Sequence, residues 1–409
     1  MKYVIVGNGP AAVNAAEAIR KIDKEGSITL FSKEDEFTYS RPLISYLLLG
    51  RTDEVRMQYK PADFYEKNAV DFRKGVMVTS IDKDAKTVTA SDGSVTPYDK
   101  LLLATGAKPF VPPIEGLDSV PYHSFMTLED ARNLKAVLTP DSRVLIIGAG
   151  LIGLKCLEGI RHLCGSVTVA DMADQILPSI LDKEAAAMVQ KHIEAQDVSF
   201  LLGDSAVAFE PGMATMKSGA KVPFDVLVMA VGVRPATDLA VSMGLDAGRG
   251  IPTDENGETA IPGVFAAGDC AVSYDITTDT KRVLALLPNA SMQGEVCGTV
   301  MAGGKPTYFN SLPLNAMGMF GLHMITAGTM TGEDHIIRSK DGYKRLCTKD
   351  NRLMGYIMVG DVERAGIYTA LIREKTPLDT IDFELMLDKP QMMAFSKRDR
   401  QIRMGGSRL

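Results

Sequence analysis

The sequence predicts an α/β fold built around two similar β-α-β units. An apolar run over 2–6 enters a Gly-x-Gly-x-x-Ala turn and then a helical pattern, and the same succession returns over 143–153 with Gly in the last position. The composition, with 45% hydrophobic and 23% charged residues, is that of a folded globular chain. A length of 409 residues gives room for two to four domains.

The first unit carries small residues at the positions that a bound dinucleotide requires. Gly7 permits the tight turn after the strand, Gly9 lets the backbone approach a pyrophosphate, and Ala12 lets the helix pack closely on the strand. The helix that follows, to residue 22, directs unpaired N–H groups and partial positive charge at the phosphates. A second strand over 27–31 completes a Rossmann-like unit.

The second unit repeats this pattern at Gly148, Gly150 and Gly153, and its second strand ends at Asp171. A carboxylate at that point accepts hydrogen bonds from an adenosine ribose and repels a 2′-phosphate, so we expect NAD rather than NADP. The matching strand end of the first unit is Ser32. Glu34 is the ribose candidate there, and a solvated loop charge is an equally compatible interpretation.

Three other predicted strands also end in turns of small residues, and one further helix start belongs with them. Strand patterns end at Ala104-Thr105-Gly106, at Gly232 and at Gly268-Asp269, where a carboxylate can hold a ribitol hydroxyl. Pro288 opens a helix whose amino end is suited to face a flavin pyrimidine and stabilise negative charge on the reduced ring.

In this order, these motifs resemble the FAD-dependent pyridine nucleotide–disulfide oxidoreductase superfamily. The resemblance is to the branch of NADH:rubredoxin reductases, ferredoxin reductases and the flavin part of nitrite reductases; it also rests on Tyr39-Ser-Arg41-Pro42 and on the stretch 360–366. It implies FAD and NAD as cofactors, and two Rossmann-like domains plus a carboxy-terminal α+β interface domain. The implied segments are FAD-binding 1–112, NAD-binding 113–237, FAD-binding 238–315 and interface 316–409.

The resemblance also implies roles for single residues. Arg41, with Pro42, would contact the FAD phosphates or ribose, and a surface ion pair is the rival interpretation. Tyr46 stands where the branch often has a Lys beside the flavin, so it is either a neighbour of the ring or ordinary helix packing. Lys155 stands where a Glu is usual near the nicotinamide; alternatively, it pairs with Glu158 at i, i+3.

The chain lacks the redox cysteine that many relatives carry near the position of Pro42. No Cys precedes Cys156, so we expect direct transfer from NADH to FAD and from FAD to an acceptor. Cys270 is the thiol that the motifs place near the flavin, and a buried structural role is its more common fate. No Cys or His spacing indicates a metal, and we expect no catalytic acid–base residue, because flavin chemistry needs none.

The resemblance favours an iron–sulfur or rubredoxin-type partner, as a free carrier protein or as another subunit of a dehydrogenase complex. The alternatives are an NADH oxidase or quinone reductase, and a low-turnover flavin redox-sensing module. Residues 316–409, rich in Met and ending in a basic tail after Phe395, are the expected region for an oligomer or complex. Core filling by the methionines and a disordered tail are the competing interpretations.

Charge and hydropathy limit the remaining classes. A net charge of −6 gives no electrostatic reason to expect nucleic acid as a partner. No apolar run approaches the roughly 20 residues of a membrane span, and a strand pattern begins at Lys2 with no signal peptide ahead of it. Five widely spread cysteines indicate reduced thiols, so we expect a cytoplasmic protein.

Overall fold

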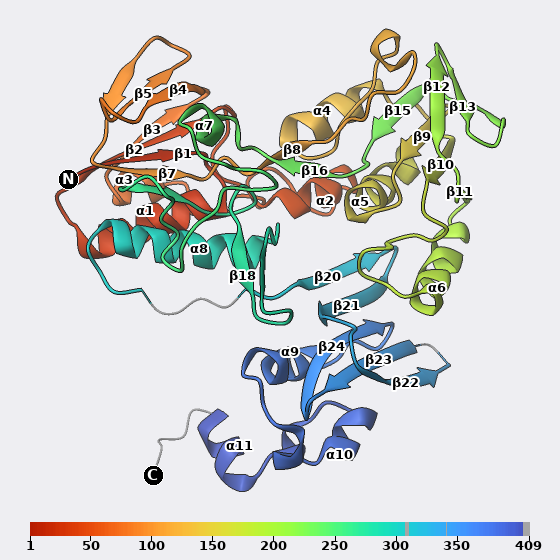
Figure 1. The fold of residues 1–409 in the computed structure, drawn as a ribbon. Helices are drawn as coiled ribbons and strands as arrows, with labels where there is room; N and C mark the ends of the chain where they lie inside the picture. The colour runs from red at the N-terminus through yellow and green to blue at the C-terminus, as the bar shows by residue number, and fades with distance from the viewer. Residues whose placement is uncertain (307–310, 341, 404–409) are drawn as a thin grey trace.

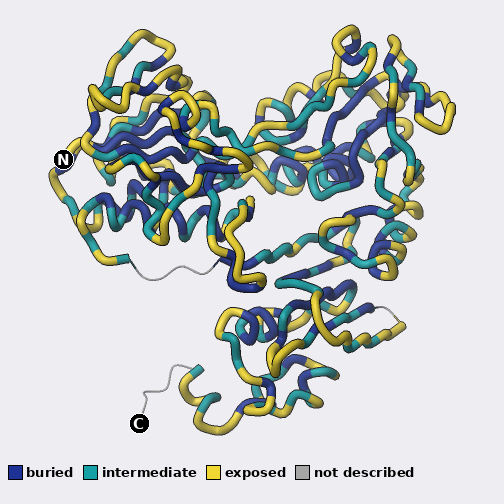
Figure 2. Tube along the Cα trace, viewed as in Figure 1, coloured by how far each residue is buried: buried dark blue, intermediate teal, exposed yellow. Residues whose placement is uncertain are grey.

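The computed structural model describes residues 1–306, 311–340 and 342–403. Two parallel sheets lie beside each other, and an antiparallel sheet lies against the second of them (Figure 1). The central strands of the sheets are buried, and the exposed positions gather in the loops and at the carboxy-terminal helices (Figure 2). The expected α/β architecture with a carboxy-terminal α+β domain is confirmed.

The first sheet is parallel and is buried on both faces, as a Rossmann-like sheet requires. Its strands lie in the order β17-β7-β1-β2-β3, with bounds β1 Lys2–Val6, β2 Ser27–Ser32, β3 Val70–Lys74, β7 Lys100–Leu103 and β17 Val264–Ala266. Tyr3 and Ile5 face two helices, α1 (Pro10–Ile22) and α8 (Leu287–Met301). Val4 and Val6 face the antiparallel meander of β4 Val78–Asp82, β5 Thr87–Ala90 and β6 Val95–Pro97. Successive residues of a strand therefore point to opposite faces of the sheet, and each face has its own hydrophobic core.

Helices α1 and α8 approach each other closely because glycines stand at the crossing. A β-carbon built on Gly294 would lie 2.0 Å from the carbonyl oxygen of Ala11, and one on Gly298 would lie 2.3 Å from that of Ala15. One turn further along α8, from Gly294 to Gly298, the contact moves one turn further along α1, from Ala11 to Ala15. The two helices therefore run parallel. Their amino ends therefore reach the same edge of the sheet.

We expect Gly294→Ala to destabilise the protein by about 2–3 kcal/mol, because its methyl group would force the helices apart in a packed core. The urea midpoint of unfolding measures this loss. Gly366→Ala is the matched control: Gly366 lies in α9 (Ala365–Arg373), and a β-carbon there would meet no atom within 4 Å. The control should gain about 0.5–1 kcal/mol from helix propensity. Equal midpoints for the two variants would contradict the close packing.

The second sheet repeats the plan of the first, with strand order β11-β10-β9-β15. Its strands are β9 Arg143–Ile147, β10 Ser166–Asp171, β11 Val198–Leu202 and β15 Val226–Met229. Helices α5 (Leu151–Ile160) and α6 (Lys183–Glu194) pack on one face. A meander of β12 Ala206–Glu210, β13 Met213–Met216 and β14 Lys221–Pro223 packs on the other. The internal repeat expected from the two glycine-rich motifs is thus an architectural repeat.

Two antiparallel strands join the first two sheets. β8 (Ala107–Pro109) leaves the first sheet and pairs with β16 (Val233–Pro235), which returns from the second (Figure 1). The guanidinium of Arg234 lies 4.4 Å from the ring centroid of Phe110, a cation–π contact that adds to this ladder. The connection is therefore a paired ribbon of two chain passages.

The third sheet is antiparallel, in the order β20-β21-β24-β23-β22. Its strands are β20 Leu314–Met319, β21 Leu322–Gly328, β22 Glu333–Ser339, β23 Gly342–Lys349 and β24 Arg352–Val359. One face packs on helix α9 through Tyr356 and Tyr368. The other face, with Met319 and Met324, shares a core with the second sheet's helices. Core filling is therefore confirmed for these two methionines.

Short elements complete the chain. The remaining helices are α2 Ile44–Leu48, α3 Phe64–Lys67, α4 Leu128–Val137, α7 Asp238–Ser242, α10 Phe383–Asp388 and α11 Lys397–Arg403. A hairpin of β18 Ser273–Asp275 and β19 Thr280–Arg282 precedes α8. The expected basic tail is helical in α11, and its end, residues 404–409 with Met404, lies outside the described residues.

Candidate functional site

The first glycine-rich turn has the geometry of a dinucleotide site. Gly7 has φ +117°, and a β-carbon on it would lie 2.1 Å from the carbonyl oxygen of Ala104, so this position tolerates only glycine. Gly9 caps α1 without a side-chain hydrogen bond, and a β-carbon on it would meet nothing within 4 Å. Ala12 is fully buried against the sheet. The helix therefore presents open N–H groups and open space at one point.

The turn of Gly268 and Asp269 lies directly against the start of α1. A β-carbon on Gly268 would lie 3.3 Å from the β-carbon of Ala11, and the Gly268 N–H donates to Oε1 of Gln293 at 2.6 Å. Pro288 stands in the first turn of α8, whose amino end has no side-chain cap. Three segments distant in sequence thus converge at one edge of the first sheet.

The carboxylate of Asp269 accepts no hydrogen bond from the described residues. Burial raises the pKa of Asp269, and the positive charge of Arg41 opposes that rise. A half-buried, unpartnered carboxylate is unfavourable without a donor. A hydroxyl group of a bound molecule, such as the ribitol of FAD, has the donor chemistry that this carboxylate can accept.

The predicted Glu34 and Arg41 lie together and form an ion pair. The Tyr39 hydroxyl donates to Oε2 of Glu34 at 2.6 Å, and Arg41 also donates to the carbonyl oxygen of Met126 at 3.0 Å. The ion pair of the rival interpretation is therefore present in the structure, and the contact of Arg41 with FAD stays a prediction. Glu34 is not a freely solvated charge, because its side chain is only 19% exposed and fully engaged.

Thr105, Gly106 and Gly232 lie where the two linking passages meet. The Thr105 hydroxyl donates to the carbonyl oxygen of Ala236 at 2.6 Å, and the Gly106 carbonyl accepts from the Ala236 N–H at 2.9 Å. Gly232 has φ +120° and accepts from the Phe110 N–H at 3.0 Å. The structure places these three residues in the ribbon between the sheets, next to the end of β7.

The second glycine-rich turn reproduces the first. Gly148 has φ +115°, and a β-carbon on it would lie 2.3 Å from the carbonyl oxygen of Ala230. A β-carbon on Gly153 would lie 2.0 Å from the Gly148 carbonyl oxygen, which explains the third glycine by close packing of α5. Gly150 caps α5 without a side chain and has open space beside it.

Asp171 ends β10 beside this turn. One carboxylate oxygen accepts from the Ala149 N–H at 2.6 Å, and the other accepts from the Ala173 N–H at 2.8 Å. Each oxygen keeps a further lone pair for a ribose hydroxyl. The next residue, Met172, is 82% exposed, and the ammonium of Lys183 is already paired with Asp174 at 2.9 Å.

Lys155 pairs with Glu158, as the i, i+3 alternative predicts. Its ammonium also lies 4.6 Å from the ring centroid of Tyr46. The two residues that stand in unusual positions for the branch are therefore neighbours. They join α5 of the second sheet to α2, which follows Arg41.

The thiols carry no sign of redox use. All five cysteines are free and buried. Cys270 is fully buried, its Sγ lies 3.4 Å from the carbonyl oxygen of Leu103, and burial raises the pKa of its thiol. A protonated, enclosed thiol is a poor nucleophile. Within the described ranges, no group of three or more His, Cys, Asp or Glu is arranged to hold a metal ion.

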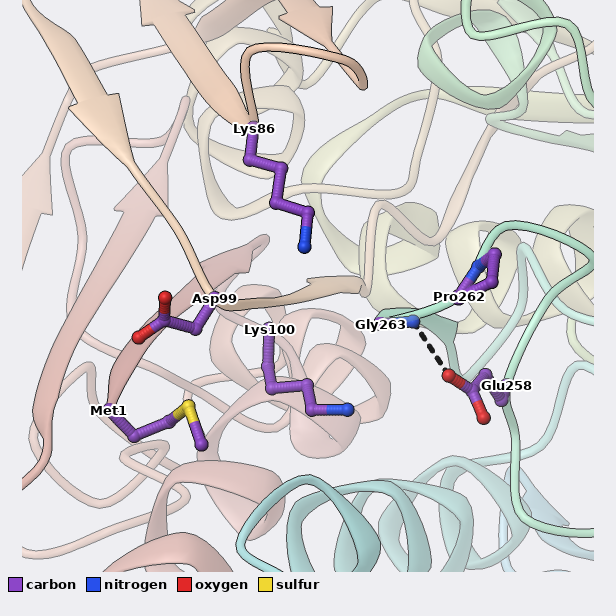
Figure 3. Close-up of a pocket in the computed structure, with 7 residues that line it drawn as sticks. All are labelled: Met1, Lys86, Asp99, Lys100, Glu258, Pro262 and Gly263. Atoms are coloured by element: carbon purple, nitrogen blue, oxygen red, sulfur yellow. Dashed lines mark hydrogen bonds between the residues drawn. The ribbon is translucent and has the colours of Figure 1, made fainter.

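A hollow of about 550 Å³ lies at the opposite edge of the first sheet (Figure 3). Lys86 and Asp99 flank it, Lys100 begins β7, and Glu258 accepts from the Gly263 N–H at 2.6 Å. Two lysines and two carboxylates line it, so it does not present charge of a single sign. The carboxyl ends of the parallel strands, where dinucleotides bind, lie at the other edge.

Sequence reasoning missed three residues that shape the site. Tyr39 was recognised in a motif, but its bond to Glu34 was not anticipated. Gln293 fixes the Gly268 turn from one helix away, and Phe320 meets α5 from the third sheet. Tyr39 lies in a recognised motif and Gln293 follows the predicted helix start by five positions, whereas Phe320 carried no local signal.

Comparison with known proteins agrees with this geometry. The family model described as pyridine nucleotide-disulphide oxidoreductase matches residues 1–294, and the model described as rubredoxin NAD+ reductase C-terminal domain matches residues 313–376. The chain is 33% identical over 390 residues to the NADH-dependent phenylglyoxylate dehydrogenase subunit epsilon of Aromatoleum evansii, covering 92% of each.

Two further similarities bear on size and architecture. Nitrite reductase [NAD(P)H] of Bacillus subtilis (strain 168) is 30% identical over 394 residues, which is 92% of this chain but only 48% of that protein. A solved structure of the covalent putidaredoxin reductase–putidaredoxin complex superposes with a TM-score of 0.87 at 25% identity, covering 96% of this chain and 97% of that one.

Two dinucleotide turns in one chain, joined by a ribbon, define a two-cofactor oxidoreductase. The chain belongs to the pyridine nucleotide-disulphide oxidoreductase family. It is an enzyme of the FAD- and NAD(H)-dependent class, as the sequence analysis expected. No helix in the described ranges is long and apolar enough to cross a membrane.

Proposed function

We propose that this protein passes electrons from NADH through FAD to an iron–sulfur or rubredoxin-type protein or subunit, without a thiol relay. The observation that carries the proposal is that no cysteine stands near Pro42, where many relatives carry the redox cysteine, while both dinucleotide turns are complete. The similarity over 92% of a dehydrogenase subunit supports the version in which the acceptor is another subunit of a complex. Such a complex would also run in the NAD-reducing direction.

We assign FAD to the first turn on chemical fit. Gly7, Gly9 and Ala12 leave open N–H groups and space for a pyrophosphate, and Asp269 offers an unpartnered carboxylate to a ribitol hydroxyl. Arg41 and Glu34 would face the phosphate or ribose. The remaining residues of this assignment are Pro42, Thr105, Gly106, Gly268 and Pro288.

We assign NAD to the second turn. Gly148, Gly150 and Gly153 form it, Asp171 would hold the ribose, and Gly232 would border the pocket. The negative charge of Asp171 supports NADH over NADPH. The corresponding division of the chain is 1–112 with 238–315 for FAD, 113–237 for NAD and 316–409 for contacts with the partner.

The proposed reaction balances in electrons and protons with NADH, FAD and two one-electron acceptors. FAD held at the first turn would supply the conversion between two-electron and one-electron chemistry: uptake of a hydride from NADH and of a proton, then release of two electrons singly and of both protons. The role of the protein's residues would be to hold the two rings in the geometry that hydride transfer needs. The five free thiols support a cytoplasmic location, because cysteines stay reduced in that compartment.

Anaerobic addition of NADH to the purified FAD-containing protein tests the proposal. We expect the visible absorbance of the flavin to bleach on reduction, and to return when an oxidised rubredoxin or ferredoxin is added. An unbleached flavin would reject the enzyme. Air restoring the colour as fast as an iron protein would favour an NADH oxidase. A reduced state that no acceptor discharges would favour a redox-sensing module.

Asp269 should make FAD binding pH-dependent. Its raised pKa means that the folded apoprotein binds this proton more tightly than the unfolded chain does. Its ionisation therefore lowers the stability of the apoprotein as pH rises from the usual Asp value through the raised one. FAD affinity should change in the opposite sense, because a ribitol hydroxyl donates best to the ionised carboxylate.

The variant Asp269→Asn separates these two effects. We expect it to raise the melting temperature of the apoprotein at pH 7 and to weaken FAD binding roughly 10- to 100-fold. Flavin fluorescence titration from pH 4 to 8 measures the affinity. Unchanged FAD affinity, or a pH dependence that survives in the variant, would remove Asp269 from the FAD site.

A further inference from the structure

Three parts of the chain meet at one small cluster of charged and aromatic side chains. Lys155 and Glu158 lie on α5, Tyr46 lies on α2, and Phe320 forms the turn between β20 and β21. α2 and α5 are in close contact, because a β-carbon on Gly159 would lie 3.2 Å from the carbonyl oxygen of Ser45. Figure 1 shows both helices between the two parallel sheets.

Glu158 is the centre of this cluster and its side chain is only 3% exposed. One carboxylate oxygen pairs with Lys155, and the other accepts from the Phe320 N–H at 2.8 Å. The Lys155 ammonium also donates to the Gly318 carbonyl oxygen at 3.3 Å. A buried carboxylate tied on both oxygens leaves the ammonium little freedom, so the position of Lys155 is fixed.

What the fixed ammonium faces is the ring of Tyr46, at 4.6 Å from its centroid. The Tyr46 hydroxyl makes no hydrogen bond to a described residue, so the ring face is what Lys155 engages. α5 starts at the Gly150 turn, and α2 starts three residues after Arg41. The contact therefore joins the helix assigned to NAD with the segment assigned to FAD.

We propose that the contact between Lys155 and Tyr46 sets the separation of α5 and α2, and thereby of the nicotinamide and flavin rings, with Glu158 as the positioning residue. This proposal rests on the assignment of FAD and NAD to the two turns. Hydride transfer requires the reacting atoms about 3–3.5 Å apart, and a displacement of about 1 Å slows such a step by up to about 100-fold. A contact that couples the two helices therefore controls rate more than affinity.

The test is a double-mutant cycle on the FAD-containing protein. Tyr46→Phe keeps the ring and Lys155→Arg keeps the cation, so both should bleach the flavin within about twofold of the wild-type rate. Tyr46→Leu and Lys155→Met should each slow bleaching about 10-fold or more. The double variant Tyr46→Leu, Lys155→Met should be no slower than either single one, because both remove the same contact.

Ring stacking is also measured without turnover. Addition of NAD+ to the dithionite-reduced protein should give long-wavelength charge-transfer absorbance in the wild type and in Tyr46→Phe, and a weaker band in Tyr46→Leu and Glu158→Gln. NADH affinity should change less than about threefold in these variants, as expected for a loss in the rate step alone. Arg338→Gln is the control, because Arg338 ties the third sheet to Glu184 at the exposed start of α6. It should match the wild type.

The outcomes separate the two proposals. Wild-type protein that NADH does not bleach would reject the proposed function itself. Normal bleaching with Tyr46→Leu behaving like Tyr46→Phe, or with losses that multiply in the double variant, would overturn the Lys155–Tyr46 contact alone. FAD content near one per chain in each variant shows that the fold is intact before rates are compared.

Discussion

Gly7→Ala is expected to yield a protein that does not retain FAD. The added β-carbon would lie 2.1 Å from the Ala104 carbonyl oxygen, and the φ of +117° is strained for any residue with a side chain. The turn would have to move, and with it the start of α1 that would hold the pyrophosphate. The FAD-to-protein ratio after gel filtration measures the effect, and we expect a loss of at least about 100-fold in affinity.

Gly9→Ala is the matched comparison two residues away. Its β-carbon would meet no protein atom within 4 Å, so the apoprotein should melt at nearly the wild-type temperature. FAD affinity should nevertheless fall, because the methyl group occupies the space that the phosphates need. Gly150→Ala should weaken NADH binding and leave FAD content unchanged. A Gly9→Ala protein with full FAD affinity would show that the pyrophosphate lies elsewhere.

The sequence was sufficient to predict the features that depend on neighbouring residues. The two glycine-rich turns, the strand end at Asp171 and the start of α8 at Leu287-Pro288 were all recognisable, because each follows from backbone freedom or from local periodicity. The i, i+3 pair of Lys155 and Glu158 was also foreseeable from helix geometry. Their functional roles remain predictions.

Contacts between distant segments were not predictable. Nothing in the local pattern indicates that the Phe320 N–H donates to Glu158, 162 residues earlier, or that Asp182 accepts from the Tyr343 hydroxyl. The pairing of Glu34 with Arg41 and Tyr39 was likewise not foreseen; it contradicts the interpretation as a solvated charge, while the role as a ribose ligand stays a prediction. Such pairs form because burial in the tertiary fold makes an unpaired charge unfavourable, which a single-sequence pattern does not reveal.

Asp171→Ala together with Met172→Arg is expected to shift the coenzyme preference from NADH toward NADPH. The ratio of kcat/KM with NADPH to kcat/KM with NADH should rise by about three orders of magnitude. Loss of a charged hydrogen bond to the ribose should weaken NADH by roughly 10- to 100-fold, and removal of the repelling charge plus an adjacent guanidinium should favour a 2′-phosphate. Met172 is suited to this change because it is 82% exposed and its replacement disturbs no core. Steady-state kinetics with both coenzymes measure the ratio.

Two single variants test whether the change in coenzyme preference comes from contact between the Asp171 carboxylate and the ribose. Asp174→Asn removes a nearby carboxylate that is paired with Lys183, and it should leave the ratio within about twofold, as for an exposed ion pair. Asp171→Asn keeps one acceptor for the Ala149 or Ala173 N–H but removes the charge. If it lowers kcat/KM equally for NADH and NADPH, Asp171 acts by shaping the turn. A selective loss with NADH means that the carboxylate binds the ribose itself.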